Sequence, residues 1–594
     1  MNGVPQHALL RGPEEAGGWL EFAAPVGGGS AGSPDEVPAL LSRAEQATRD
    51  GLWAVGWVGY EAAPGFDRAL PTRPPSGPVA AFGFFRPPER LELAAEEASV
   101  AVTGALRPVL DAAGHARAVA AIRAGIAAGE TYQVNLTFPL IGRLEVEPET
   151  AFRRLAAAAA SPLAAFLDLG GEAILSLSPE LFFDLDGERI VMRPMKGTRP
   201  RGRYTEEDRA LRRELAGSAK DRAENLMIVD MVRNDLGRIS RPGSVIATSL
   251  NDLERYPTVW QMTSTVEGRT TAPMAEIFGA LFPCASITGA PKPRAMEFIA
   301  RLEPQPRGIY CGAIGWLAPI SSKSPMPLSA GEGRRARFSV AIRTAAVDRK
   351  SGALRYGVGS GIVWDSDPVA EYDECLVKAR GFEAESEPAA LLETMRWAPW
   401  SGVRRFSRHL ARLADSADYF GLPFDEGRVR AAVAEVVATL PPAVHRLRLR
   451  LDRSGAPSLE AEPLERAARS WRAVLAAGPV DASSPLLFHK TVRREVYDRT
   501  LAEARSRGAD EAILWNGRGE LTEGTRTNLA LRLDGRWLTP SRSSGLLAGV
   551  LRGELLDRGR IREAVLGVDD LARAEAVALF SALRGFLRVE LLPS

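Results

Sequence analysis

The segment Lys220-Asp221-Arg222-Ala223-Glu224-Asn225 lies within a predicted helix that spans residues 209–234. Asp221 and Glu224 are three residues apart, so both carboxylates lie on one face of that helix. A second acidic segment, residues 371–374, repeats the spacing with Glu371 and Glu374. Two carboxylates from each of two helices can hold a hard divalent cation such as Mg²⁺, which prefers oxygen ligands. Taken alone, either pair is explained more simply as a solvated acidic helix face.

Three further segments make a ligand site the better explanation. Residues 286–292 form a loop of small residues that ends at Lys292 and runs into a predicted helix. Backbone amides at a helix start favour an anion, and the Lys292 ammonium adds positive charge. Arg343 lies in an apolar predicted strand, where a guanidinium usually needs an anionic partner such as a carboxylate. Residues 357–361 include three glycines, which let the backbone approach a ligand closely.

Lysine is scarce, with seven lysines among 75 lysines and arginines. Arginine serves surface charge as well as lysine does, but only lysine can lose its proton when desolvated and attack a carbon atom. Lys196 is the only lysine before Lys220, and Lys490 is the only one after Lys378. Biased codon usage explains this scarcity better than it explains the placement. We therefore treat Lys196 and Lys490 as candidate nucleophiles.

The length of 594 residues predicts two or three domains, since a single core rarely extends so far. The acidic and Ser/Pro-containing stretch 383–390 is the predicted linker, because a new α/β pattern begins after it. This places a first domain at residues 1–382, with its catalytic core at 110–380, and a second domain at 391–594.

Composition limits the classes of partner. A net charge of +1 gives no reason to expect binding to nucleic acid or to an anionic membrane. The three cysteines have no zinc-ligand spacing and form no disulfide framework. We find no signal-peptide pattern and no apolar run of about 20 residues, the length a membrane helix needs. These features predict a cytoplasmic enzyme.

Six motifs in the first two thirds of the chain occur in the order seen in chorismate-utilising enzymes. They are Ser178-Pro179-Glu180, Pro194-Met195-Lys196-Gly197-Thr198, and the segments 221–235, 286–292, 307–310 and 365–374. The chain therefore resembles a family that includes anthranilate synthase component I, aminodeoxychorismate synthase component I, isochorismate synthase and salicylate synthase. The resemblance implies an α/β (α+β) fold with an anthranilate-synthase-like β-sandwich flanked by helices. It also implies that chorismate is the substrate and Mg²⁺ a cofactor.

The same resemblance implies a role for each matching residue. Glu224 and Glu374 would contact the metal directly, and Asp221 and Glu371 would act through its waters. Glu180 would be the general acid that protonates the departing 4-hydroxyl, which requires a carboxyl group kept protonated by its surroundings. The implied substrate-binding residues are Gly197, Thr198, Thr288, Lys292, Tyr310, Arg343, Gly359, Ser360 and Gly361.

Lys196 separates the members of this family. Anthranilate synthases usually carry a small residue at this point, whereas aminodeoxychorismate synthases resembling the bacterial type carry lysine. In that chemistry the lysine amine attacks C2 of chorismate, and ammonia then adds at C4 and expels it. The alternative is that Lys196 clamps a substrate carboxylate. Gln133 stands where isochorismate and salicylate enzymes use a lysine base for water, which argues against water as the nucleophile.

The last third resembles the fold-type IV pyridoxal-phosphate enzymes. Lys490 is followed by residues 523–528, 538–540 and 547–551 in the order found in branched-chain and D-amino acid aminotransferases and aminodeoxychorismate lyase. This implies that Lys490 holds pyridoxal 5'-phosphate covalently and that Glu523 pairs with the pyridine nitrogen. The alternative for Lys490 is a solvated lysine at a helix start. The resemblance is compatible with a homodimer through this domain. The other implied cofactor-binding residues are Arg412, Asn528, Val550, Leu551 and Ser581.

The two resemblances together predict a bifunctional enzyme of 4-aminobenzoate (folate) biosynthesis. It would aminate chorismate at C4 to 4-amino-4-deoxychorismate and then eliminate pyruvate to leave 4-aminobenzoate. We find no glutaminase motif, so ammonia would come from a separate glutamine amidotransferase subunit or from free ammonium. One alternative is anthranilate synthase component I fused to a class IV aminotransferase. Another is a non-catalytic chorismate-binding regulator with a degenerate second domain.

Overall fold

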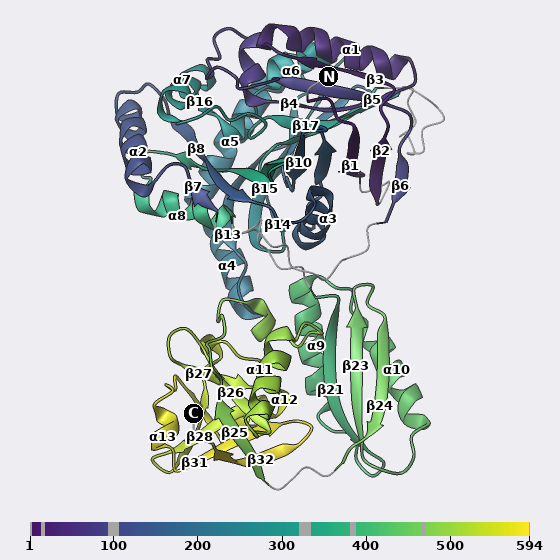
Figure 1. Ribbon diagram of the computed structural model, residues 1–594, viewed down its shortest axis with the longest axis vertical. Helices are drawn as coiled ribbons and strands as arrows, with labels where there is room; N and C mark the ends of the chain where they lie inside the picture. Colours follow the sequence, from purple (N-terminus) through teal and green to yellow (C-terminus); the bar gives the residue numbers. More distant parts are fainter. Residues whose placement is uncertain are drawn as a thin grey trace. The chain divides into compact units, whose positions relative to one another are not determined.

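The computed structural model describes residues 3–13, 18–92, 106–319, 334–379, 388–465 and 470–592 (Figure 1). The chain divides into two compact units, Met1–Pro200 with Arg212–Ser386 and Arg201–Leu211 with Glu387–Ser594. Most of the predicted linker 383–390 lies outside the described residues. Within the described part of the chain, no helix is long and apolar enough to cross a bilayer.

Two large antiparallel sheets form the first unit. One has the strand order β16-β8-β20-β19-β10-β9-β1-β2-β6, with β7 paired to β8, and the other β13-β15-β12-β11-β18-β17-β4-β5-β3, with β14 paired to β15. The first contains β1 (His7–Arg11), β2 (Trp19–Ala23), β6 (Glu89–Leu91), β7 (Arg107–Pro108), β8 (Gln133–Arg143), β9 (Ala165–Asp168), β10 (Glu172–Ser176), β16 (Gly289–Ala290), β19 (Thr344–Asp348) and β20 (Ala353–Ile362). The second contains β3 (Gly27–Ala31), β4 (Trp53–Val58), β5 (Ala80–Phe85), β11 (Leu181–Asp186), β12 (Arg189–Arg193), β13 (Met195–Pro200), β14 (Ile246–Arg255), β15 (Val259–Arg269), β17 (Ala313–Ala318) and β18 (Arg335–Val340).

Alternating apolar side chains join the two sheets into a sandwich. Leu20 and Phe22 from β2 share one buried cluster with Trp53 and Val55 from β4 and Trp316 from β17. Successive strand residues point to opposite faces, so every second residue of these strands enters the core. The expected α/β fold with a central β-sandwich is confirmed.

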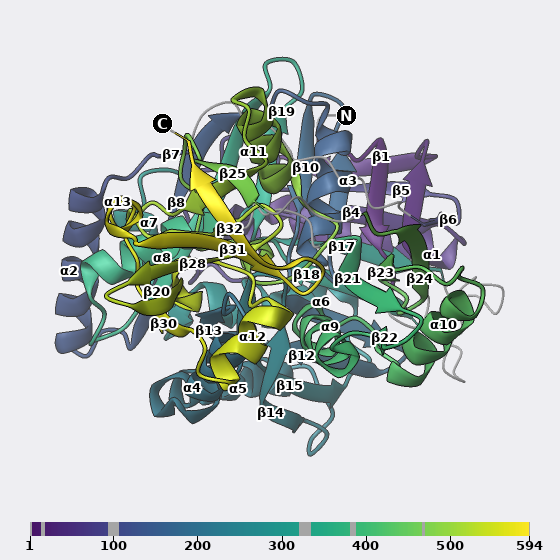
Figure 2. The ribbon, with the colours of Figure 1, turned by 90° about the horizontal axis from the view of Figure 1, so that it is seen from below.

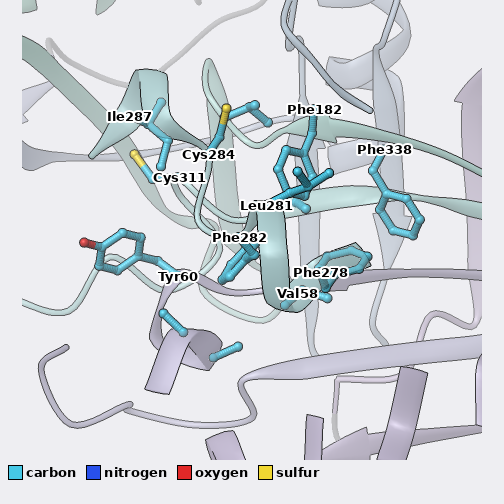
Figure 3. Close-up of a cluster of buried hydrophobic side chains, with 14 of the residues drawn as sticks. Val58, Tyr60, Phe182, Phe278, Leu281, Phe282, Cys284, Ile287, Cys311 and Phe338 are labelled. Carbon is cyan, nitrogen blue, oxygen red and sulfur yellow. The ribbon is translucent and has the colours of Figure 1, made fainter. Parts of the chain in front are cut away.

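Helices cover the sandwich and enclose a second, aromatic core (Figure 3). In it the ring centroids of Phe278 and Phe338 lie 5.2 Å apart, and those of Phe182 and Phe278 lie 5.7 Å apart. Such edge-to-face pairs stabilise a core beyond their buried area. The helices are α1 (Val37–Arg49), α2 (Ala112–Ala127), α3 (Pro148–Ala159), α5 (Ala219–Gly237), α6 (Met274–Leu281), α7 (Lys292–Leu302) and α8 (Pro368–Ala379).

The single helix predicted over residues 209–234 is wrong, because the structure contains two helices there. They are α4 (Thr205–Gly217) and α5, and Ser218 separates them in an extended conformation. Gly217 weakens the helix, and the Ser218 side chain accepts a hydrogen bond from the Asp221 amide as the N-cap of α5. The break fixes where α5 begins, and with it the direction in which Asp221 and Glu224 point.

The second unit contains two sheets. The smaller has the order β22-β21-β23-β24, and α9 and α10 pack on it (Figure 1). Its strand β23 alternates leucine with arginine, and it buries its leucines and exposes Arg448 and Arg450. The elements are β21 (Ala390–Ala398), β22 (Gly402–Val403), α9 (Phe406–Phe420), α10 (Glu426–Ala438), β23 (His445–Asp452) and β24 (Pro457–Pro463).

The larger sheet of this unit is mixed and has the order β27-β26-β25-β32-β31-β28-β29-β30. The β31–β32 hairpin occupies its centre (Figure 2). The elements are β25 (Ser470–Leu475), α11 (Glu495–Ser506), β26 (Glu511–Trp515), β27 (Leu521–Gly524), β28 (Asn528–Leu533), β29 (Arg536–Pro540), α12 (Val550–Asp557), β30 (Arg562–Ala564), α13 (Asp570–Arg573), β31 (Ala576–Ser581) and β32 (Gly585–Leu591).

The segment Arg201–Leu211 belongs to the second unit, although it lies within the sequence of the first. The side chain of Arg201 is 4% exposed, forms an ion pair with Asp208 at 2.7 Å and donates a hydrogen bond to the Tyr419 carbonyl. The Tyr204 ring packs on Phe488, with ring centroids 5.2 Å apart. Phe488 lies two residues before Lys490, so this segment supports the loop that carries that lysine.

Candidate functional site

Lys196 extends from β13 toward a glycine of β20, a strand of the other sheet. A Cβ atom placed on Gly361 would lie 2.6 Å from Lys196 Nζ and 3.0 Å from Gln133 Nε2. Glycine is therefore required at this position, because any side chain would occupy the place of the amine. Gln133 is fully buried, and neither polar atom of its side chain has a partner among the described residues. The amine thus lies beside an amide group whose hydrogen-bonding capacity is unused.

Burial lowers the pKa of Lys196, and Lys378 lowers it further. The carboxylates of Glu224, Glu374 and Glu180 oppose this shift without cancelling it. The structure therefore places three of the predicted acidic residues around the predicted nucleophile. A lowered pKa increases the fraction of neutral amine, which is the form that attacks carbon.

Glu180 is 3% exposed, and burial raises its pKa to about 7. Hydrogen bonds from Ser286 and the Met195 backbone, together with the charge of Lys196, limit this rise. Its Oε1 atom has no hydrogen-bond partner among the described residues. A buried carboxyl group with a free oxygen and a pKa near neutrality can donate a proton to a bound ligand.

The four carboxylates predicted to bind metal each contact another protein group. Glu374 forms an ion pair with Lys378 at 2.7 Å, and Glu224 with Lys220 at 3.9 Å. Burial raises the pKa of Glu224, and the nearby carboxylates of Asp221 and Glu371 add to that rise. Repulsion of this kind favours a divalent cation, which suits an all-oxygen donor set. Among the described residues, however, no three acidic, histidine or cysteine side chains lie close enough together to hold a metal ion.

Arg343 lies between β18 and β19 with a positive φ of 50°. Burial lowers the pKa of its guanidinium, and only Tyr356 and Tyr256 oppose the shift. Within the described parts of the chain, no carboxylate forms an ion pair with Arg343. A half-buried guanidinium without a protein anion is suited to a carboxylate of a ligand. Tyr310 packs its ring against β20, where a Cβ on Gly357 would lie 2.2 Å from the ring.

Other predicted substrate-binding residues are engaged with the protein itself. The Thr288 hydroxyl donates to the Cys284 carbonyl at 3.0 Å, and Lys292 Nζ lies 2.9 Å from Asp235. Lys292 therefore does not offer the free charge expected from the sequence. The Thr198 hydroxyl donates to Gln261, and that side chain in turn donates to the Gly197 carbonyl. On β20, the Gly359 carbonyl accepts from Lys378, and Ser360 and Gly361 pair with Leu136 and Asn135 of β8.

The second unit contains a cavity of about 400 Å³. Its size is in the range typical of small-molecule and cofactor sites. Every residue predicted to bind pyridoxal phosphate lines it: Arg412, Lys490, Glu523, Asn528, Val550, Leu551 and Ser581.

Lys490 is held at one edge of the smaller sheet, because its carbonyl accepts a hydrogen bond from the Leu392 amide at 2.8 Å. Burial lowers its pKa from 10.5 to about 7. The charges of Arg494 and Arg412 contribute to this shift, and the carboxylates of Glu393 and Glu523 oppose it. At neutral pH a large fraction of this amine is therefore neutral and able to react with an aldehyde.

Glu523 lies at the end of β27 and is 5% exposed. It accepts hydrogen bonds from the Tyr497 hydroxyl at 2.9 Å, the Leu547 amide at 3.1 Å and the Asn528 side chain at 3.3 Å. Burial nevertheless raises its pKa to about 7. A carboxyl group this close to its titration point is suited to share a proton with a heterocyclic nitrogen.

Arg412 is committed to a protein partner. It forms two parallel hydrogen bonds of 2.8 Å with Glu393, and His409 also contacts that carboxylate, at 2.7 Å. These partners hold the pKa of Glu393 below its usual range, although burial acts in the opposite direction. The residues that remain for a phosphate group are the first amides of α12, at Val550 and Leu551, with Ser581. The donor set of the cavity therefore fits pyridoxal phosphate.

Sequence reasoning missed three residues that support these sites. Asn225 is 1% exposed, donates to the Lys196 carbonyl at 3.3 Å and contacts Ser264. Lys378 lies four residues after Glu374, which is a spacing that predicts their ion pair. Tyr497 is two residues inside α11, and no sequence pattern connects it to Glu523.

Comparisons with known proteins agree with this division into two sites. Residues 33–384 match the family described as chorismate binding enzyme, and residues 390–592 match the family described as amino-transferase class IV. The second match implies pyridoxal phosphate as a cofactor.

Three curated relatives resemble the first unit. The aminodeoxychorismate synthase of Streptomyces griseus is 44% identical over 287 residues, covering 48% of this chain and 38% of that protein. Aminodeoxychorismate synthase component 1 of Klebsiella aerogenes is 40% identical over 307 residues, covering 50% of this chain and 65% of that protein. Anthranilate synthase component 1 of Streptomyces coelicolor is 34% identical over 449 residues, covering 64% of this chain and 85% of that protein. The chain thus spans less than two thirds of the length of the first two relatives. It belongs to the chorismate-binding enzymes, with a class IV aminotransferase domain in the same polypeptide.

Proposed function

We propose that this chain converts chorismate into 4-aminobenzoate in two steps, one in each unit. The observation that supports this most directly is the half-buried amine of Lys196 with a lowered pKa, in the electrostatic reach of Glu180. An acid and a nucleophile side by side are what a displacement of a hydroxyl group requires.

In the first step the neutral amine of Lys196 attacks C2 of chorismate, and the ring double bonds shift. Glu180 gives its proton to the 4-hydroxyl, which leaves as water. Ammonia then adds at C4 and expels the Lys196 amine, so the product is 4-amino-4-deoxychorismate. Arg343 would hold a substrate carboxylate, since its guanidinium has no ion pair with the described residues. The unused amide of Gln133 would help to orient the amine.

We further propose that Mg²⁺ binds beside this site. Glu224 and Glu374 would hold it directly, and Asp221 and Glu371 through water. The cation would neutralise the charge of a substrate carboxylate and of the acidic residues, since burial and then the repulsion of Asp221 and Glu371 raise the pKa of Glu224. In its presence Lys378 and Lys220 would lose their ion pairs with Glu374 and Glu224.

The second step belongs to the 400 Å³ cavity of the second unit. Bound pyridoxal phosphate supplies an electron sink that stabilises negative charge on the carbon next to the substrate nitrogen. Lys490 would hold the cofactor, and its amine, when free, would take the proton from C4 of the substrate. Breaking of the C3–O bond would then release enolpyruvate, which takes up a proton to become pyruvate, and the ring would become aromatic. Glu523 would keep the cofactor nitrogen protonated.

Three further properties are proposed: the source of ammonia, the cellular location and the oligomeric state. Ammonia would come from a separate glutamine amidotransferase subunit or from free ammonium. The enzyme would act in the cytoplasm, and a homodimer would form through the second unit.

A product assay tests the proposal. The protein is incubated with chorismate, Mg²⁺, ammonium and pyridoxal phosphate, and we expect 4-aminobenzoate and pyruvate in equal amounts. Lys196→Ala should lose the first step, and Lys490→Ala should accumulate 4-amino-4-deoxychorismate. The exposed Lys350→Ala serves as the matched control. Anthranilate as the main product would instead identify an anthranilate synthase joined to an aminotransferase, and no turnover at all would favour a regulator.

A further inference from the structure

The cavity of the second unit is far more basic than its cofactor requires. Among its lining residues, seven arginines and Lys490 face only two carboxylates, Asp498 and Glu523. A cofactor phosphate carries at most two negative charges, and Lys490 is consumed when it binds the aldehyde. Carboxylates outside the lining neutralise part of this charge, as Glu393 does for Arg412, and the remainder is available for the substrate. The arginines are Arg412, Arg446, Arg448, Arg493, Arg494, Arg526 and Arg584.

Two of these arginines lie over one buried tryptophan, and a third lies near one of them. The guanidinium carbons of Arg526 and Arg584 lie 5.5 Å and 5.2 Å from the ring centroid of Trp471, which is 7% exposed. Arg446 is close enough to influence Arg584 electrostatically. Stacking on an aromatic face holds a guanidinium in one orientation and leaves its donors available.

The protein's own anions balance only part of this cluster. Glu511 is fully buried, lies 3.8 Å from Arg526 and also accepts a hydrogen bond from the Thr525 amide. Arg446 is paired with Glu462. Within the described residues, Arg584 forms no ion pair. Burial lowers the pKa of Arg584, and the charges of Arg526 and Arg446 lower it further. A guanidinium destabilised in this way would bind an added anion strongly.

We propose that Arg584, oriented by Trp471 and assisted by Arg526 and Arg446, binds a carboxylate of the substrate, and that this cavity accepts dicarboxylic amines. The inference rests on the proposed function, because 4-amino-4-deoxychorismate carries one carboxylate on its ring and a second on its enolpyruvyl group. An ordinary amino acid carries one carboxylate at the carbon that bears the amine. In 4-amino-4-deoxychorismate neither carboxylate lies on that carbon, so Arg584 would bind a carboxylate that is remote from the reacting amine.

The test measures the second step alone, with the full-length protein carrying pyridoxal phosphate and 4-amino-4-deoxychorismate as substrate. Arg584→Met removes one charge-assisted, hydrogen-bonded contact with the substrate carboxylate. Its KM should therefore be about 10- to 100-fold higher than that of wild type. We expect kcat to change little and the cofactor absorbance and affinity to stay unchanged. Arg584→Lys keeps the charge but loses the planar fork, so its KM should lie between that of wild type and that of Arg584→Met. The exposed Arg588→Met, on the same hairpin and outside the cavity, is the matched control.

Inhibitors give a readout that does not depend on turnover. Wild-type protein should bind 3-(carboxymethoxy)benzoate, which has two carboxylates, more tightly than 3-methoxybenzoate, which has one. Arg584→Met should remove most of this preference. An unchanged KM together with an unchanged inhibitor preference would overturn the inference, and so would loss of cofactor affinity, which would make Arg584 a phosphate ligand. If wild type binds the dicarboxylate tightly but releases no pyruvate, the proposed function fails while the inference stands.

Discussion

At Glu180, the burial that makes the carboxyl group useful also makes it costly to ionise. Its pKa rises from 4.5 to about 7 in the folded chain, so the native state binds more protons than the unfolded state between these values. Stability therefore falls as the pH rises through this window, by about 3 kcal/mol in total. The same carboxyl group is protonated, and able to act as an acid, only below about pH 7.

Glu180→Gln separates these two effects. We expect the first step to slow by about 100-fold or more, because the proton donor is lost. Above pH 7 the variant avoids a buried negative charge. The thermal midpoint of the variant minus that of wild type should therefore be larger at pH 8 than at pH 5. Product assays and thermal melts at both pH values check this. A constant difference between the two midpoints across the range would contradict the raised pKa.

Lys490 should be reactive at a pH where most lysines are protonated. Burial and two arginines lower its pKa to about 7, so acylation of the cofactor-free protein should rise with a midpoint near pH 7. Peptide mass spectrometry measures the labelled fraction, with the exposed Lys350 as internal standard for reagent loss. Pyridoxal phosphate should protect Lys490 and leave Lys350 labelled. A midpoint above pH 9 would show that the amine is solvated.

The sequence singled out candidate reactive residues in both units but not their protein partners. Lysine is rare in this chain, which made Lys196 and Lys490 conspicuous. The partners of Lys292 and Arg412 are 57 and 19 residues away in the sequence. No local pattern connects such pairs, because chain folding alone brings them together. Both side chains would have to exchange a carboxylate of the protein for an anion of a ligand.

At the scale of elements, β20 determines how close Lys196 comes to its neighbours. Its glycines were read from the sequence as points of close approach, and the structure adds what approaches each of them. Tyr310 packs at Gly357, and the Lys196 amine lies at Gly361. The break between α4 and α5 was missed, although Gly217 and the capping Ser218 are local signals for it.

Gly361→Ala should abolish the first step without unfolding the protein. The added methyl group would lie 2.6 Å from Lys196 Nζ, and the flexible end of that side chain can move away. We expect at least a 100-fold slower first step, an unchanged second step and a thermal midpoint close to that of wild type. Gly315→Ala is the contrasting variant, because its Cβ would lie 2.1 Å from the Arg337 carbonyl on the paired strand. It should lower the midpoint strongly. A Gly361→Ala enzyme with normal first-step activity would place the amine elsewhere.

At the scale of the whole molecule, each site is built from residues of a single unit. The groups around Lys196 all belong to Met1–Pro200 and Arg212–Ser386, and those around Lys490 belong to Glu387–Ser594. Nothing in the chemistry of either step requires a residue from the other unit.

Two inactive variants should therefore complement each other. When Lys196→Ala and Lys490→Ala proteins are mixed, we expect 4-aminobenzoate to form after a lag, because 4-amino-4-deoxychorismate made by the second variant diffuses to the first. The lag should shorten as the amount of the Lys196→Ala protein increases. Each variant alone is the control. If the mixture forms no 4-aminobenzoate although each half-reaction is intact when assayed separately, the intermediate is never released.

The placement of Arg201–Leu211 limits how the two units could be encoded as separate proteins. Those codons lie in the middle of the gene region for the first unit, yet the peptide they encode packs against Tyr419 and Phe488 of the second. A gene that broke between the two units would leave the downstream half without a part of its own interior.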